Sequence, residues 1–130
     1  MVLGKVWGST CLKLRTPLLE VHQLSILPCA RCSLHMHRLK HNAFYVVSGR
    51  LWIVVEKLDY ALTDTTELGP GDFTTVPPGE YHRFVSGPEP VSALEFYYLE
   101  PLSEDITRKD HGAAAGVGYL CPDNALVPDG

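Results

Sequence analysis

Short runs of apolar and alternating residues, separated by proline and glycine, fill most of the chain from residue 10 to residue 100. Their spacing of roughly ten residues and their content of β-branched and aromatic side chains are typical of a β-sandwich or β-barrel. No window before Pro101 holds the helical period, so the chain is predicted to be all-β. The predicted strands are Thr10–Thr16, Leu18–Leu27, Ser33–Leu39, Ala43–Ser48, Leu51–Leu58, Asp72–Val76, His82–Ser86 and Val91–Glu100.

Glycine and proline mark the turns between these strands. Ser48-Gly49-Arg50 predicts a hairpin, and the segments Gly69–Asp72 and Pro77–Glu80 predict tight turns. After Pro101, the charged segment Ser103–Asp110 predicts one short helical turn with Ser103 as its N-cap. The sequence therefore predicts one domain over residues 1–112, followed by an Ala-, Gly- and Pro-rich tail over residues 113–130.

Two predicted strands, Phe44–Val47 and Leu51–Val55, are apolar on both faces instead of alternating. Apolar residues on the outer face of a barrel strand imply that something covers that face. The cover is either another part of this chain or a second subunit, and we expect a homodimer.

Composition narrows the class of protein. The 130 residues are 45% hydrophobic and 20% charged, which is typical of one globular domain. Eleven basic residues against fifteen acidic ones give a net charge of -4, and the absence of a basic patch argues against nucleic acid. No apolar run approaches the ~18 residues of a membrane span, and no secretory signal is recognisable. We expect a cytoplasmic protein with a small-molecule ligand and no membrane partner.

Histidines carry the clearest chemical signal. His35 and His37 stand two residues apart, which on a strand places both imidazoles on one face, roughly 7 Å apart at the backbone. His82 opens another predicted strand, directly after a Pro-Gly turn. The pattern predicts that His35, His37 and His82 share one divalent metal ion.

The spacing of these residues resembles the two motifs of the cupin superfamily. In the first motif His35-Met36-His37 is followed by Asn42 and Gly49, and in the second Gly71 is followed by Pro77-Pro78-Gly79, His82 and Ser86. The resemblance implies a double-stranded, jelly-roll-like β-barrel. It also implies one divalent metal ion, which would be Zn, Ni, Fe or Mn.

A narrower resemblance covers about residues 6–112. Val6-Trp7-Gly8, the segment Tyr45–Gly49 and the segment Ser103–Arg108 are similar to the cupin domain of type II mannose-6-phosphate isomerases. This implies chemistry on a sugar phosphate and makes Arg108 a candidate phosphate ligand.

Asn42 departs from the cupin pattern, in which this position holds a glutamate that binds the metal. An amide oxygen is neutral, so Asn42 is expected to bind the metal weakly or through a water, and it cannot serve as a base. Two interpretations stay open: a three-histidine metal centre, or a pocket that binds a ligand without metal. His41 is an alternative ligand, although strand alternation turns it away from Asn42.

Further candidates surround the predicted barrel mouth. The catalytic candidates are Tyr45 and Glu95, and the substrate-binding candidates are Lys40, Tyr81, Tyr97 and Arg108. Strand alternation from His82 turns Phe84 inward and Arg83 outward. His22 and His111 are isolated and are expected to be structural or exposed.

A competing metal site would combine Cys29 and Cys32 with the two nearby histidines as a zinc knot. Strand alternation argues against it, because Cys32 would point away from the others. Three functions remain: a metal-dependent enzyme acting on a small polar or sugar-phosphate-like substrate, a three-histidine iron dioxygenase, and a non-catalytic binding module for a small molecule.

Overall fold

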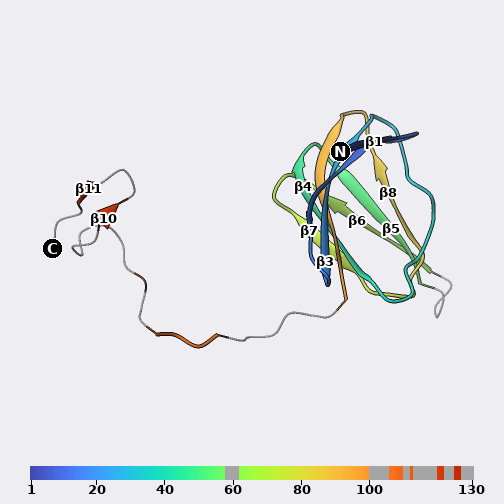
Figure 1. The fold of residues 1–130 in the computed structure, drawn as a ribbon. Coiled ribbons are helices and arrows are strands. Elements are labelled where there is room, and N and C mark those ends of the chain that lie inside the picture. Colours follow the sequence, from blue (N-terminus) through green and yellow to red (C-terminus); the bar gives the residue numbers. More distant parts are fainter. Residues whose placement is uncertain (58–61, 100–105, 110–111, 113–119, 122–124, 127–130) are drawn as a thin grey trace.

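The computed structural model describes residues 1–57, 62–99, 106–109, 112, 120–121 and 125–126. These residues form eleven strands and no helix (Figure 1). The strands are β1 (Val2–Lys5), β2 (Gly8–Arg15), β3 (Leu19–Ile26), β4 (His41–Ser48), β5 (Leu51–Lys57), β6 (Leu62–Leu68), β7 (Phe73–Val76), β8 (His82–Ser86), β9 (Val91–Tyr98), β10 (Leu120–Cys121) and β11 (Ala125–Leu126).

Nine of these strands build a barrel from two antiparallel sheets. The larger sheet has the order β1-β2-β3-β9-β4-β7, and the smaller sheet has the order β6-β5-β8. Figure 1 shows the two sheets wrapped around a common interior. The all-β prediction is confirmed. No helix long and apolar enough to cross a membrane occurs in the part of the chain that the structure describes.

Strict alternation along the strands divides the barrel interior into an apolar end and a polar end. In β4, Asn42, Phe44 and Val46 point inward and are buried. In β9, Ala93 and Glu95 do the same. The apolar core includes Leu24, Ile26, Val46, Leu51, Ile53 and Ala93. The buried polar residues include Asn42, His82 and Glu95.

Several predicted elements need correction. Ser33–Leu39 is not a strand: outside the named strands it makes one isolated β-bridge, between His35 and His82. β1 and β6 were not predicted, since β6 (Leu62–Leu68) is polar and almost entirely exposed. The tail contains the short antiparallel pair β10 and β11.

The predicted helical turn is only partly covered by the structure. Residues 106–109 carry no helix and are exposed, while Ser103–Asp105 and Asp110 lie outside the described residues. The other predicted strands match the observed ones to within about two residues at each end, which is the usual accuracy of such boundaries.

Candidate metal centre

His35 and His82 are aligned by their own backbones. The amide N of His35 donates to the carbonyl O of His82 at 3.0 Å, and the amide N of His82 donates to the carbonyl O of His35 at 2.8 Å. Directly opposed residues of such an antiparallel pair place their side chains on the same face. The two imidazole centroids accordingly lie 4.8 Å apart.

His37 is held against the same cluster by the turn that precedes β8. The amide N of Gly79 donates to the carbonyl O of His37 at 2.8 Å. Gly79 has a φ of 87°, a left-handed conformation that glycine adopts without strain. The His37 ring centroid lies 5.2 Å from that of His35 and 5.5 Å from that of His82.

The three histidines form a group that could hold a metal ion, as predicted. Their candidate ligand nitrogens all lie within 4.8 Å of one another. Metal–nitrogen bonds of about 2.1 Å would require the rings to close in slightly. The group arises without a His-x-His strand, because the bridge to His82 and the Gly79 contact orient the two side chains instead.

The hydrogen bonds of the imidazoles leave their free nitrogens suited to a cation. Nδ1 of His35 lies 2.8 Å from the Ser33 carbonyl O, and Nδ1 of His82 lies 2.9 Å from the Glu80 carbonyl O. Each Nδ1 must therefore carry the proton in the neutral ring, which leaves the lone pair on Nε2. Backbone carbonyls commonly fix metal-binding histidines in this way.

The contact between Asn42 and His82 also favours a bound cation. Its Nδ2 donates to the Phe96 carbonyl O at 3.0 Å, so its Oδ1 faces Nε2 of His82, also at 3.0 Å. In the neutral ring this contact sets one lone pair against another. A cation near both atoms would turn this opposition into attraction. In addition, Nε2 of His37 is buried without a hydrogen-bond partner among the described residues. The residues fit a divalent metal ion.

Burial keeps these imidazoles in the form that binds metal. Burial, with a smaller effect of His35, lowers the pKa of His37 to about 4. Burial also lowers the pKa of His82, although the hydrogen bond to the Glu80 carbonyl opposes the change. At neutral pH both rings are therefore uncharged, with a lone pair available.

Glu95 supplies a carboxyl group beside Asn42. It points inward from β9, is 7% exposed, and places Oε2 3.4 Å from Nδ2 of Asn42. Burial raises the pKa of Glu95 to about 7, while hydrogen bonds from Tyr97 and Asn42 lower it by less. A carboxyl group, which position 42 lacks, is thus present on the neighbouring strand.

A cavity of about 320 Å³ opens beside these groups. His35, Glu95 and Tyr97 line it, together with His22. Tyr97 packs edge-on against His37, with ring centroids 5.1 Å apart. A small ligand in this cavity would therefore contact His35 and Glu95 together.

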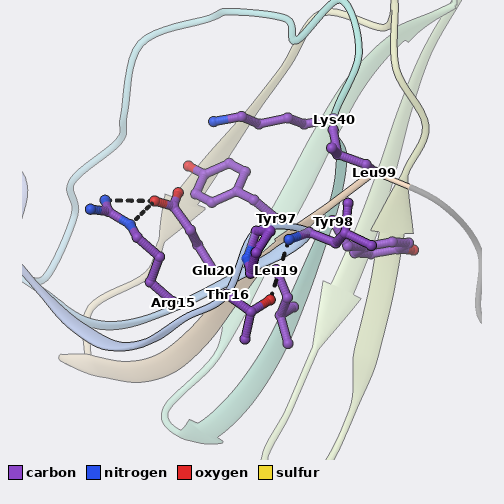
Figure 2. Close-up of a pocket in the computed structure, with 10 residues that line it drawn as sticks. Arg15, Thr16, Leu19, Glu20, Lys40, Tyr97, Tyr98 and Leu99 are labelled. Carbon is purple, nitrogen blue, oxygen red and sulfur yellow. Dashed lines mark hydrogen bonds and ion pairs between the residues drawn. The ribbon is translucent and has the colours of Figure 1, made fainter.

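Tyr97 also forms the wall of a second cavity, of about 270 Å³ (Figure 2). Figure 2 shows Lys40, Tyr97 and Glu20 directed into the same space. The Lys40 Nζ lies 5.3 Å from the Tyr97 ring centroid, and Arg15 pairs with Glu20 at 2.6 Å. Lys40 and Tyr97, both predicted substrate-binding residues, thus meet at one cavity.

The other predicted residues lie elsewhere. Tyr45 is on the outer face of β4, 38% exposed, and does not join the cluster. Tyr81 is 37% exposed and lines neither cavity. Arg108 is exposed and lines neither cavity. His41 stacks on Tyr98 with ring centroids 5.1 Å apart, turned away from Asn42 as predicted.

The cysteines do not form the alternative zinc site. Cys29 is exposed, whereas Sγ of Cys32 is buried and accepts a hydrogen bond from the Phe84 amide N at 3.2 Å. Burial raises the pKa of the Cys32 thiol to about 11. Over the described ranges, the group of potential metal ligands contains histidines alone. Phe84 is buried, and Arg83 points to the opposite face, as predicted.

Sequence analysis missed the polar inner positions of β3. Glu20 pairs across the sheet with Tyr97, and His22 pairs with Glu95. Nε2 of His22 lies 3.7 Å from Oε2 of Glu20. Glu20 and His22 continue the two-residue spacing of Leu24 and Ile26, which are buried core residues. This alternation could have predicted that they point inward.

Comparison with known proteins agrees with this architecture. The cupin domain model matches residues 23–97, more than half of the 130 residues. No curated protein sequence matches the chain. Among solved structures, KdgF from Halomonas sp. has a TM-score of 0.64 at 18% identity, over 75% of this chain and 83% of that one.

Two further structures share the fold. The cupin domain of Cnp3 from Schizosaccharomyces pombe has a TM-score of 0.62 at 14% identity, over 71% of this chain and 61% of that one. A variant of Bacillus subtilis oxalate decarboxylase has a TM-score of 0.69 at 17% identity, over 79% of this chain but 28% of that one. The motifs, the barrel and the matched domain lead to one conclusion: the chain belongs to the cupin family.

Proposed function

We propose that this cupin is a metal-dependent enzyme that transfers a proton on a small polar substrate. In this proposal His35, His37 and His82 hold one divalent ion, and Glu95 is the general acid–base group. The observation that carries the proposal is the position of Glu95, which lines the same cavity as His35 and touches the amide of Asn42.

The bound ion would act as a Lewis acid toward a substrate carbonyl or hydroxyl. Glu95 does the proton transfer, because a carboxyl group with a pKa of about 7 is populated in both protonation states near neutral pH. Asn42 donates from Nδ2 to Glu95 and thereby orients the carboxyl group. Tyr97 stays neutral, since burial raises the pKa of its hydroxyl.

The finer assignment is an isomerase that acts on a sugar or sugar phosphate. Isomerisation between neighbouring carbons needs one base that removes and returns a proton, and Glu95 is placed for this role. Lys40 lies across Tyr97 from the histidine cluster, where its ammonium group is available to an anionic substituent. For the ion we propose Zn, Ni, Fe or Mn. Support for Mn comes from a structure of Bacillus subtilis oxalate decarboxylase that concerns its Mn(II) centres.

The first experiment measures metal content by elemental analysis after purification and dialysis. Wild type is expected to hold about one ion per chain, and His82→Ala to lose most of it, because two protein ligands remain. His41→Ala is the matched control, since His41 stacks on Tyr98 outside the cluster. Equal metal content in His82→Ala and wild type would contradict the metal centre.

The second experiment follows incorporation of deuterium from D₂O into hydroxy-aldehydes, hydroxy-ketones and their phosphates. Metal-loaded wild type is expected to exchange a carbon-bound proton of at least one compound, and Glu95→Gln to lose this exchange. Glu56→Gln, on β5, is the control. Oxygen consumption without exchange would instead identify a three-histidine iron dioxygenase. Binding with neither activity would identify a binding module.

A further inference from the structure

The N-terminal hairpin forms part of the wall of the cavity that His35 and Glu95 line. A two-residue turn joins β1 to β2, with Lys5 opposite Gly8. The Trp7 ring packs edge-on against Phe84 of the other sheet, with centroids 4.9 Å apart. The Trp7 carbonyl O accepts a hydrogen bond from the Leu27 amide N at 2.8 Å. The hairpin is therefore a fixed wall of the cavity.

One face of β1 lines this cavity, although all four residues of the strand are exposed to solvent. Leu3 and Lys5 line it together with Trp7, and they come from the same face of the strand as Thr10. The wall thus offers two apolar side chains and one ammonium group to the space that His35 and Glu95 also reach.

Lys5 is a cation without an internal counter-ion. Among the described residues, Arg15, Arg50 and Lys57 each form an ion pair with a glutamate, but no such pair involves Lys5. Glu95, a carboxyl group that lines this cavity, is already hydrogen-bonded to Asn42 and Tyr97. Lys5 is exposed to solvent and lines the cavity, so its ammonium group can meet an anionic group of a ligand that enters there.

We propose that the N-terminal hairpin determines the substrate class of this site, with Lys5 binding the anionic group of a small organic acid. The apolar surfaces of Leu3 and Trp7 would contact the body of that molecule. This inference rests on the broad proposal of proton transfer on a small polar substrate, because it places the ligand in the cavity that His35 and Glu95 line. It names a small organic acid as that substrate, in place of the sugar phosphate of the finer assignment.

The test compares benzoate with benzamide, which have nearly the same shape and differ in charge. Binding is measured by calorimetry on the full chain loaded with Co(II), and again on the metal-free chain. Wild type is expected to bind benzoate more tightly than benzamide. Lys5→Met keeps the length of the side chain but removes its charge, so it is expected to weaken benzoate binding about fivefold and leave benzamide unchanged.

Controls separate this inference from the metal site. Lys13 is exposed like Lys5 but does not line the cavity, so Lys13→Met removes the same charge and is expected to change neither affinity. Lys5→Arg is expected to retain the preference for benzoate. Co(II) content is measured for every variant.

Each outcome has a distinct meaning. If Co(II) binds but Lys5→Met and wild type bind benzoate equally, the Lys5 inference is overturned and the metal centre stands. If Co(II) does not bind but benzoate binds the metal-free chain through Lys5, the anion site stands and the metal-dependent function is overturned. If benzoate does not bind wild type at millimolar concentration in either state, the inference is overturned.

Discussion

Oδ1 of Asn42 faces Nε2 of His82 at 3.0 Å, although neither atom carries a hydrogen when the ring is neutral and Nδ1 donates to Glu80. The lone pairs of these two atoms repel each other, so a cation bound near both atoms would be stabilised. Replacing the amide by a carboxylate should strengthen that preference, because a charged oxygen would then face the cation.

We therefore expect Asn42→Asp to raise metal affinity by about tenfold or more, measured by competition with a chelator. The metal-free variant should be less stable by about 1–3 kcal/mol, because the hydrogen bond to Phe96 is lost from a fully buried position. Gln23→Glu on β3 adds the same charge outside the site. An equal gain in that control would attribute the effect to net charge and contradict the local explanation.

The pH dependence of unfolding in the metal-free protein should reveal two opposing groups. Glu95 has a folded pKa of about 7, above the ordinary 4.5, so its contribution to stability falls as pH rises from about 4.5 to 7. His37 has a folded pKa of about 4, below the ordinary 6.5, so its contribution falls as pH drops from 6.5 to 4. Across the shared window the two slopes oppose each other.

Glu95→Gln should remove one of these slopes. The free energy of unfolding of this variant should rise between pH 4.5 and 6.5, whereas that of wild type should change less. Above pH 7 the variant should be more stable than wild type by at most about 3 kcal/mol. Chemical denaturation at several pH values, with a chelator present, measures both. Parallel pH profiles for the variant and wild type would show that Glu95 is not the group that titrates.

The turn at Gly79 should matter for metal binding as well as for stability. Its φ of 87° strains any residue with a Cβ, although no atom lies within 4 Å of that Cβ position. Gly79→Ala should therefore cost about 1 kcal/mol of unfolding free energy and weaken metal affinity by displacing His37. Gly4→Ala is the control, because Gly4 has the same open surroundings and no positive φ. Unchanged metal affinity in Gly79→Ala would show that the conformation of this turn does not determine the position of His37.

A second copy of the chain is the proposed cover for the outer face of the larger sheet. Phe73 is 70% exposed and pairs across β4 and β7 with Tyr45, and Val47 is also exposed on this face. The outer positions of β3, β9, β4 and β7 contain no Asp, Glu, Lys or Arg, so two copies would meet without repulsion between like charges.

Phe73→Glu should therefore convert a dimer into a monomer in light scattering at high protein concentration. Leu62→Glu places the same charge on an exposed leucine of the other sheet and should leave the dimer intact. A wild-type mass of one 14.4 kDa chain would refute the dimer.

The spacing of the β-rich runs and turns was sufficient to predict the barrel, and the two motifs that resemble cupins indicated His35, His37 and His82. The sequence could not give the surroundings of Asn42. Glu95 lies 53 positions further along the chain, and only the register between β4 and β9 brings the two together. β6 escaped prediction for a different reason: its side chains are polar, and its strand conformation comes from pairing with β5.

His35 shows how residues can be correctly predicted to lie together from an incorrectly predicted strand. The prediction placed His35 and His37 on a strand, but the segment leaves regular structure after a single bridge to His82. The side chains still converge, because one bridge fixes His35 and the Gly79 amide fixes His37. Long-range hydrogen bonds of this kind leave no periodic trace in the sequence.

The neutrality of the proposed metal ligands would couple metal loading to proton release. Imidazole and amide ligands carry no charge when they bind a metal, so the charge of a bound dication would stay uncompensated, and Glu95 is the buried acid beside Asn42. A positive charge nearby favours the ionised carboxylate, so Glu95 would give up its proton to solvent as the ion arrives. By linkage, the ion would bind more weakly as the medium becomes acidic.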